Sequence, residues 1–341
     1  MPGTNFAGNC NVEYYPGTRL LKPCHPLPED IRTCQEKYGK KVILALGGES
    51  GYQLSGTSEG QAFADYLWGA FGPKSANSGQ FRPFESSEVD GFDFDIEVPS
   101  SGKCVNSISS SWPANNGIDN QAGYVAMINR LRSHFDKELK QYLITGAPQC
   151  IVQDKNMGQM IKQTKFDILL VQFYNTPECS ARRFVDSGDG MTYKDWTDFI
   201  AGTPSANAKI YIGLSAHKNA ANKAHYLHAG EVEKLVEAHA GYSNLGGIML
   251  WEATRAEANT QEGGKPYYEV VKDILLKYAG SATESQKTTK APVNKRPTVA
   301  SSNEVSTRPT FLIVQILVLK LAAEVPAVEP LPYLNASVPF S

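Results

Sequence analysis

Three carboxylates stand at alternate positions in residues 90–97, DGFDFDIE, with bulky apolar residues between them. Side chains two residues apart in a β-strand point to the same face, so Asp93, Asp95 and Glu97 are expected to share one face. Like charges this close cannot all ionise cheaply, and we expect at least one pKa to be raised. A carboxyl group that stays protonated near neutral pH can act as a general acid. Asp90 has the opposite parity and is expected to serve elsewhere.

Residues 90–97 have two alternative interpretations in which the acids are not catalytic. A calcium-binding EF-hand loop needs glycine at its sixth position, but counting from Asp93 that position is Val98. A solvent-exposed edge strand would keep Phe92, Phe94 and Ile96 packed while showing the acids to water. The calcium loop fails on its glycine, whereas the edge strand fits the pattern, so the spacing alone favours a site only modestly.

The elements that must position these acids are short apolar runs alternating with longer amphipathic ones, from about residue 40 to 280. This alternation is typical of an α/β fold built around a parallel sheet. The strand candidates are residues 41–46, 90–97, 142–147, 166–174, 209–214 and 247–251. Helices are expected over residues 61–71, 124–135, 232–236 and 267–278, the last with Gly280 as its C-cap.

Composition narrows the class of protein. The 341 residues are 41% hydrophobic, enough for one large core, and 33 basic against 35 acidic residues give no electrostatic footprint for nucleic acid.

We place the main domain at 1–280, a disordered linker rich in Ser, Thr, Lys and Pro at 281–309, and a short apolar tail of unknown role at 310–341. Residues 311–323 are apolar but shorter than the ~20 residues that span a bilayer, so we expect no membrane span. The first residues, MPGTNFAGNC, contain no recognisable secretory signal.

The six cysteines stand at positions 10, 24, 34, 104, 150 and 179, with no CxxC pair and no Cys/His cluster at zinc spacing. We therefore expect no metal and no cofactor. The scatter suits either disulfides or buried thiols, and spacing cannot choose between them.

With DGFDFDIE at the end of an expected strand, the chain resembles glycoside hydrolase family 18, whose signature is DGxDxDxE. It is most similar to the class III chitinases of fungi and plants. The resemblance covers about residues 1–280 and recurs in order at LALGG (44–48), ADYLW (64–68), APQC (147–150), VQFYN (171–175) and GGIMLW (246–251). It implies a (β/α)8 TIM barrel.

The resemblance also implies a retaining mechanism without an enzyme nucleophile. Glu97 matches the proton donor, which later acts as base towards water. Asp95 matches the residue that orients the substrate acetamido group, whose carbonyl attacks the anomeric carbon, and Asp93 matches the inner acid coupled to Asp95. Asp95 would stabilise the charge that develops on the cyclic intermediate.

Four further residues are matched to substrate binding: Gln172, Tyr174, Trp251 and Asn175. Gln172 and Tyr174 match the polar pair that lines the cleft, and Trp251 matches the tryptophan under the reacting sugar, although aromatic residues also fill barrel cores. Asn175 can equally cap a turn. His217 has no matched role and is expected at the surface.

The chain departs from the family pattern at its start. NFAGNC at residues 5–10 matches the loop after the second barrel strand, so we expect an incomplete barrel that lacks its first two strands, through N-terminal truncation. The unpaired strand edges of such a barrel are expected to lower its stability and, through folding, its activity. By resemblance, Cys10 pairs with Cys24 and Cys150 with Cys179, Cys34 has lost its partner, and Cys104 has no counterpart.

We expect an endo-acting chitinase that hydrolyses β-1,4-linked N-acetylglucosamine polymers, with chitin or a chitooligosaccharide as its partner. The family leaves two alternatives, an endo-β-N-acetylglucosaminidase on N-glycans and an inactive chitin-binding or truncated product. Family resemblance further implies an extracellular or cell-wall location. We expect a monomer.

Overall fold

The computed structural model describes residues 3–5, 13–17, 22, 26–48, 54, 56–77, 79–97, 120–279 and 320–322. Its strands are β1 Gly3–Asn5, β2 Ile43–Gly48, β3 Gly91–Ile96, β4 Leu143–Gly146, β5 Ile168–Gln172, β6 Lys209–Ser215, β7 Leu245–Trp251 and β8 Lys320–Ala322. Its α-helices are α1 Leu27–Arg32, α2 Thr57–Phe71, α3 Asn120–Phe135, α4 Gly158–Gln163, α5 Ala181–Ser187, α6 Tyr193–Ala201, α7 Ala229–His239, α8 Ala253–Ala258 and α9 Tyr267–Tyr278. One π-helical turn, η1 Thr33–Lys37, and three 3-10 turns, η2 Lys74–Ala76, η3 Pro177–Cys179 and η4 Lys223–His225, complete the elements.

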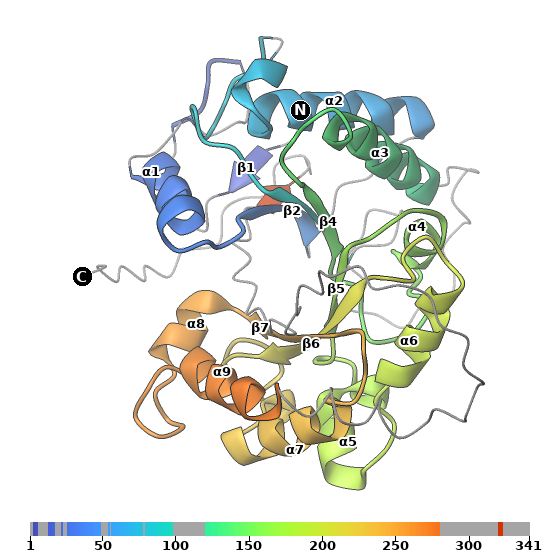
Figure 1. Ribbon diagram of the computed structural model, residues 1–341, viewed down its shortest axis with the longest axis vertical. Helices are drawn as coiled ribbons and strands as arrows, with labels where there is room; N and C mark the ends of the chain where they lie inside the picture. Colours follow the sequence, from blue (N-terminus) through green and yellow to red (C-terminus); the bar gives the residue numbers. More distant parts are fainter. Residues whose placement is uncertain are drawn as a thin grey trace, which may run out of the picture.

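Six parallel strands form the centre of the molecule, and helices surround them (Figure 1). Strands β2 to β7 pair in chain order, each with the next, and all six predicted strands are present. The predicted α/β class and the helix over 267–278 are therefore confirmed. Gly280, the expected cap of α9, lies outside the described residues. That two barrel strands are missing stays a prediction.

Strands β1 and β8 lie at the β2 side of the sheet. β8 pairs antiparallel with β1, and it pairs parallel with β2 at one position, Leu46 with Leu321. The described part of the apolar tail is thus a strand beside the edge of β2. The predicted linker, 281–309, lies outside the described residues. No helix in the described part of the chain is long and apolar enough to cross a membrane.

The two faces of the sheet have separate cores. Alternate strand residues such as Phe92, Phe94 and Val171 belong to a large buried cluster that also contains residues of the surrounding helices. The other face carries a smaller cluster made of Ala147, Ile168, Leu170, Tyr174, Tyr211 and Met249. Because strand side chains alternate, the predicted parity of residues 90–97 is confirmed, with the aromatic residues on the helix side.

The amino end of β3 is fixed by Asp90. Its carboxylate accepts hydrogen bonds from the backbone N–H of Val42 and the side-chain amide of Gln35, both at 2.8 Å. Burial alone would raise the pKa of Asp90, but these bonds and the nearby Lys140 and Lys41 outweigh it and lower the pKa. As expected from its parity, Asp90 serves the fold: it ties β3 to the chain before β2.

Candidate active site

The three acids follow one another from the middle of β3 to the residue after its carboxyl end. Asp93 and Asp95 are almost fully buried, at 2% and 5% exposure, whereas Glu97, one residue beyond the strand, is partly exposed. The alternation of the strand therefore produces a row of carboxylates that runs from the interior of the sheet to its edge. An acid at the accessible end of such a row can exchange a proton with a bound molecule, while the buried acids act on it electrostatically.

Gln172, the last residue of β5, connects two of these acids. Its side-chain nitrogen Nε2 lies 3.2 Å from both Asp95 Oδ1 and Glu97 Oε1, and 3.0 Å from the carbonyl oxygen of Ala147. An amide nitrogen is only a donor, so these contacts favour acceptor oxygens on both acids. The sequence therefore brings the predicted residues Asp95, Glu97 and Gln172 into one hydrogen-bonded group.

Asp93 has a neighbour that the sequence analysis did not single out. Thr145 of β4 is the register partner of Asp93, and its hydroxyl donates to Asp93 Oδ1. Burial raises the pKa of Asp93 to about 6, against the lowering effect of this hydrogen bond. One of the three acids thus has a raised pKa, as expected, but the cause is burial and not the repulsion between carboxylates on which the expectation rested. The available signal was that Thr145 is a polar residue in an otherwise apolar predicted strand.

A glycine lets the acids lie close to the neighbouring strand. Gly47 of β2 has φ +104°, a conformation that favours glycine, and a Cβ there would lie 2.4 Å from the carbonyl oxygen of Asp95. Gly47 and Asp95 are register partners. The first glycine of the LALGG motif on β2 is therefore explained by the close approach of the backbone of β3.

Tyr174, two residues past the end of β5, is buried in the smaller core cluster. Burial, followed by the negative charges of the three acids, raises the pKa of its hydroxyl well above the usual value. The phenol therefore stays protonated and remains a potential hydrogen-bond donor beside the carboxylates.

Trp251 ends β7 and is partly exposed, packed against the cluster that contains Tyr174. Its carbonyl oxygen accepts a hydrogen bond from the backbone N–H of Ala216 at 2.7 Å. The carbonyl oxygen of Ala216 in turn accepts from Asn259 Nδ2 at 2.9 Å. These two hydrogen bonds connect the main chain of Trp251 to the residue that follows β6 and, through it, to the C-cap residue of α8.

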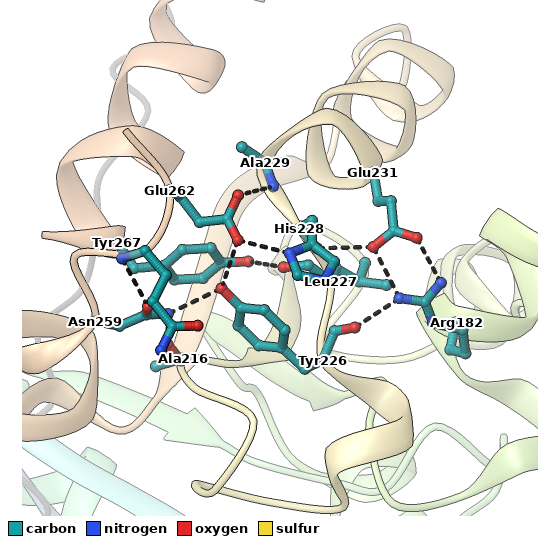
Figure 2. Close-up of polar contacts among 11 residues, drawn as sticks. Arg182, Ala216, Tyr226, Leu227, His228, Ala229, Glu231, Asn259, Glu262 and Tyr267 are labelled. Carbon is teal, nitrogen blue, oxygen red and sulfur yellow. Dashed lines mark hydrogen bonds and ion pairs between the residues drawn. The ribbon is translucent and has the colours of Figure 1, made fainter. Parts of the chain in front are cut away.

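A polar network outside the sheet includes Asn259 and continues from it (Figure 2). Asn259 also donates to the Tyr226 hydroxyl, which donates to Glu262 at 3.2 Å. Arg182 of α5 donates to both carboxylate oxygens of Glu231, at 2.6 and 2.8 Å, and to the carbonyl oxygen of Tyr226. Charge-assisted bonds of this paired kind fix orientation well. The network joins α5, α7 and the segments that follow β6 and β7.

Two residues considered at the carboxyl ends of the strands have local structural contacts. Asn175 is exposed with φ +64°, and its side-chain oxygen accepts from the backbone N–H of Asn222 at 2.9 Å. These contacts fit the turn-forming alternative, and a substrate contact for Asn175 stays a prediction. His217 is partly exposed, and its Nδ1 accepts from the backbone N–H of Asn219.

The predicted disulfide between Cys150 and Cys179 is present, with Cα atoms 5.7 Å apart. It joins the loop after β4 to η3, near the carboxyl ends of β4 and β5. Cys34 has a free thiol. Cys10, Cys24 and Cys104 lie outside the described residues. Within the described ranges, no group of His, Cys, Asp and Glu residues could bind a metal ion.

Comparison with known proteins shows which family the chain is similar to. The sequence model of Glycosyl hydrolases family 18 matches residues 26–291. The chain is 39% identical over 289 residues to Endochitinase 2 of Coccidioides posadasii, covering 81% of this chain and 31% of that protein. It is 39% identical over 318 residues to Endochitinase A1 of Aspergillus fumigatus, covering 90% and 35%. The chain spans about a third of the length of these curated relatives.

Solved structures resemble the fold as well. A chitinase from Ipomoea carnea is 25% identical with a TM-score of 0.55, over 74% of this chain and 79% of that one. A xylanase and α-amylase inhibitor protein from Scadoxus multiflorus is 27% identical with a TM-score of 0.55, over 80% and 87%. The predicted resemblance is confirmed, and the chain belongs to the glycosyl hydrolases of family 18.

Proposed function

We propose that this chain is an endo-acting chitinase that hydrolyses β-1,4-linked N-acetylglucosamine polymers by a retaining, substrate-assisted mechanism. Support comes from the row of acids on β3 and from relatives named endochitinases. In the proposed mechanism, carboxyl groups of the protein and the acetamido group of the substrate carry out every step.

In the proposed reaction Glu97 protonates the glycosidic oxygen. It is the most accessible of the three acids, and the hydrogen bond from Gln172 restricts the position of its carboxyl group. After the first bond breaks, the Glu97 carboxylate takes a proton from water, which attacks the anomeric carbon. Bond cleavage and water attack thus use the same group.

The substrate acetamido oxygen forms a bond to the anomeric carbon, and Asp95 stabilises the positive charge on the resulting ring. This stabilisation is strong because Asp95 is shielded from water. Asp93, deeper in the sheet, is the inner acid whose protonation responds to that of Asp95. Tyr174 contacts the reacting sugar, and Trp251 lies beneath it.

The observation that carries this proposal is the shared contact of Gln172 with Asp95 and Glu97. It supports the assignment because the two groups required to act on neighbouring atoms of one sugar are joined through a single side chain. A solvent-exposed edge strand, the alternative raised by the sequence, does not account for two buried acids.

The test is hydrolysis of a fluorogenic chitotriose substrate by the parent, by Glu97→Gln and by Asp95→Asn, with circular dichroism on the same samples. We expect both variants to fold and to lose at least about a hundredfold in rate. As a matched control, Glu138→Gln changes a carboxyl group after α3 and should retain the parent rate. A Glu97→Gln variant as fast as the parent would contradict the role of the acid.

A second candidate function is an inactive binding or inhibitory role on the same scaffold. Its support is the likeness to proteins described as xylanase and α-amylase inhibitors. A folded parent without activity on chitooligosaccharides or on N-glycans would favour it. Cleavage of N-glycans alone would instead favour an endo-β-N-acetylglucosaminidase. For the active enzyme we propose an extracellular or cell-wall location, where its polymeric substrate occurs, and a monomeric state.

A further inference from the structure

The backbone of Glu97 lies just beyond the pairing of β3 with its neighbours. On the β2 side the last register pair is Gly48 with Ile96, and on the β4 side it is Phe94 with Gly146. The strand ladders therefore end before Glu97. A separate contact must fix its main chain if its carboxyl group is to keep a constant position.

Asn156 supplies that contact. Its side-chain nitrogen Nδ2 donates to the backbone carbonyl oxygen of Glu97 at 3.0 Å, and the residue is 5% exposed. It comes from the loop between β4 and α4, 59 positions away in the chain. A buried amide with a backbone acceptor is a well-determined hydrogen bond, because losing it leaves a carbonyl without that partner.

Asp154 keeps Asn156 in place. Its carboxylate oxygen Oδ1 accepts from the backbone N–H groups of Asn156 and Met157, at 2.7 and 2.8 Å, in a compact turn. Asp154 is 4% exposed, and burial raises its pKa although these bonds lower it. The mechanism proposed above gives this buried acid no chemical role.

The same loop is attached at further points. Gln121 of α3 donates to the carbonyl oxygen of Lys155 at 2.9 Å, and Cys150 is bonded to Cys179. At the start of the loop, the carbonyl oxygen of Ala147 accepts from Gln172. One segment, attached to the rest of the fold at several points, thus contacts both Gln172 and the main chain of Glu97.

We propose that Asn156 is a positioning residue that fixes the main chain of Glu97 for proton donation, and that Asp154 holds Asn156 in the required turn. This inference rests on the proposed function of Glu97 as the acid. It concerns one step: transfer of the proton from Glu97 to the oxygen of the leaving group as the glycosidic bond breaks.

Two substrates separate this role from a general structural one. An N-acetylglucosamine oligomer has a sugar leaving group and needs the proton, whereas a dinitrophenyl chitobioside has a leaving group that departs with little protonation. In Asn156→Asp, which keeps the size of the side chain, we expect kcat/KM on the oligomer, which reports the steps up to cleavage of the glycosidic bond, to fall by about tenfold to hundredfold. On the dinitrophenyl substrate kcat/KM should fall by less than about threefold, because bond cleavage there needs little protonation of the leaving group.

Asn77→Asp is the matched control. Asn77 Nδ2 also donates to backbone carbonyl oxygens, those of Gly69 and Gln80, but it lies in the connection that leads to the amino end of β3. It should keep the parent rate on both substrates. If Asn156→Asp does not fold by circular dichroism, Asn156→Ser, a shorter side chain that removes the same donor, takes its place.

The outcomes are distinct. Equal losses on both substrates in a folded Asn156 variant, or no loss on either, would overturn the role of Asn156 alone. A folded parent that hydrolyses neither substrate would overturn the proposed function, and the role of Asn156 with it. A selective loss on the oligomer supports both.

Discussion

The side-chain amide of Gln172 donates to Glu97 Oε1 at 3.2 Å and so connects the end of β5 to the residue that follows β3. The same nitrogen contacts Asp95 Oδ1 at the same distance. Two carboxyl groups with different proposed tasks therefore share one neutral donor.

Replacing Gln172 by leucine removes this donor at nearly constant volume. We expect kcat/KM on chitooligosaccharides to fall about tenfold to hundredfold, about 1.4–3 kcal/mol, because both acids lose a hydrogen bond in a buried setting. Steady-state kinetics of the folded variant measures the change. Gln35→Leu is the control, since Gln35 donates to Asp90 at the other end of β3. Equal losses in both variants would argue against a specific role for Gln172.

The buried Asp93 makes stability depend on pH. Its pKa rises from 3.8 to about 6 on folding, so the protonated form is favoured in the folded state. Its contribution to stability is fully present below pH 3.8 and is lost as the pH rises through about 6. At about 1.4 kcal/mol per pKa unit, the loss is about 3 kcal/mol.

Urea unfolding at pH 4 and pH 7 tests this expectation through Asp93→Asn, which cannot ionise. Between these pH values the parent should lose about 2.4 kcal/mol relative to the variant, because a small part of the total loss has already occurred at pH 4. Asp136→Asn, a change at an exposed carboxylate after α3, should follow the parent. A pH dependence that is the same in the parent and in Asp93→Asn would show that Asp93 does not titrate in this range.

Local patterns predicted the part of the site that lies on one strand. The two-residue period of β3 was sufficient to place Asp93, Asp95 and Glu97 on one face and Phe94 on the other, because side-chain direction in a strand is a local property. Gln172 and Cys150 came from family resemblance, since their partners are remote in the chain. No spacing rule connects residue 172 with residue 97.

The contacts that sequence could not predict depend on register and on loop conformation. Thr145 reaches Asp93 only because β3 and β4 pair in one register, which is decided by the whole sheet. Asn156 reaches Glu97 from a loop whose turn is formed by Asp154. Strand β8 pairs Leu321 with Leu46 across most of the chain, a contact that its short apolar run did not indicate.

The ion pair between Arg182 and Glu231 should matter more than an exposed one. The Arg182 side chain is 19% exposed and donates to Glu231, to Asp186 and to the carbonyl oxygen of Tyr226, so Arg182→Ala removes a donor from all three groups. We expect a loss of about 2–4 kcal/mol in the free energy of unfolding, measured in urea. Lys194→Ala, which breaks the Lys194–Asp198 pair with side chains 67% and 60% exposed, should cost less than about 1 kcal/mol. Similar losses in both variants would contradict this ranking.

The bridge between Cys150 and Cys179 should stabilise the folded state by restricting the unfolded chain. The two residues are 29 positions apart, and a loop of that size corresponds to about 3–4 kcal/mol in the chain-entropy estimate. The double variant Cys150→Ser/Cys179→Ser should lose about this amount in urea unfolding without reductant. Under reducing conditions the difference from the parent should nearly disappear, because the parent then loses the same restraint. Cys34→Ser removes a free thiol and keeps the bridge, so it should lose the same stability on reduction as the parent does. A parent whose stability is unaffected by reduction would mean that the bridge does not form in solution, and the loop that carries Asn156 would then depend on its hydrogen bonds alone.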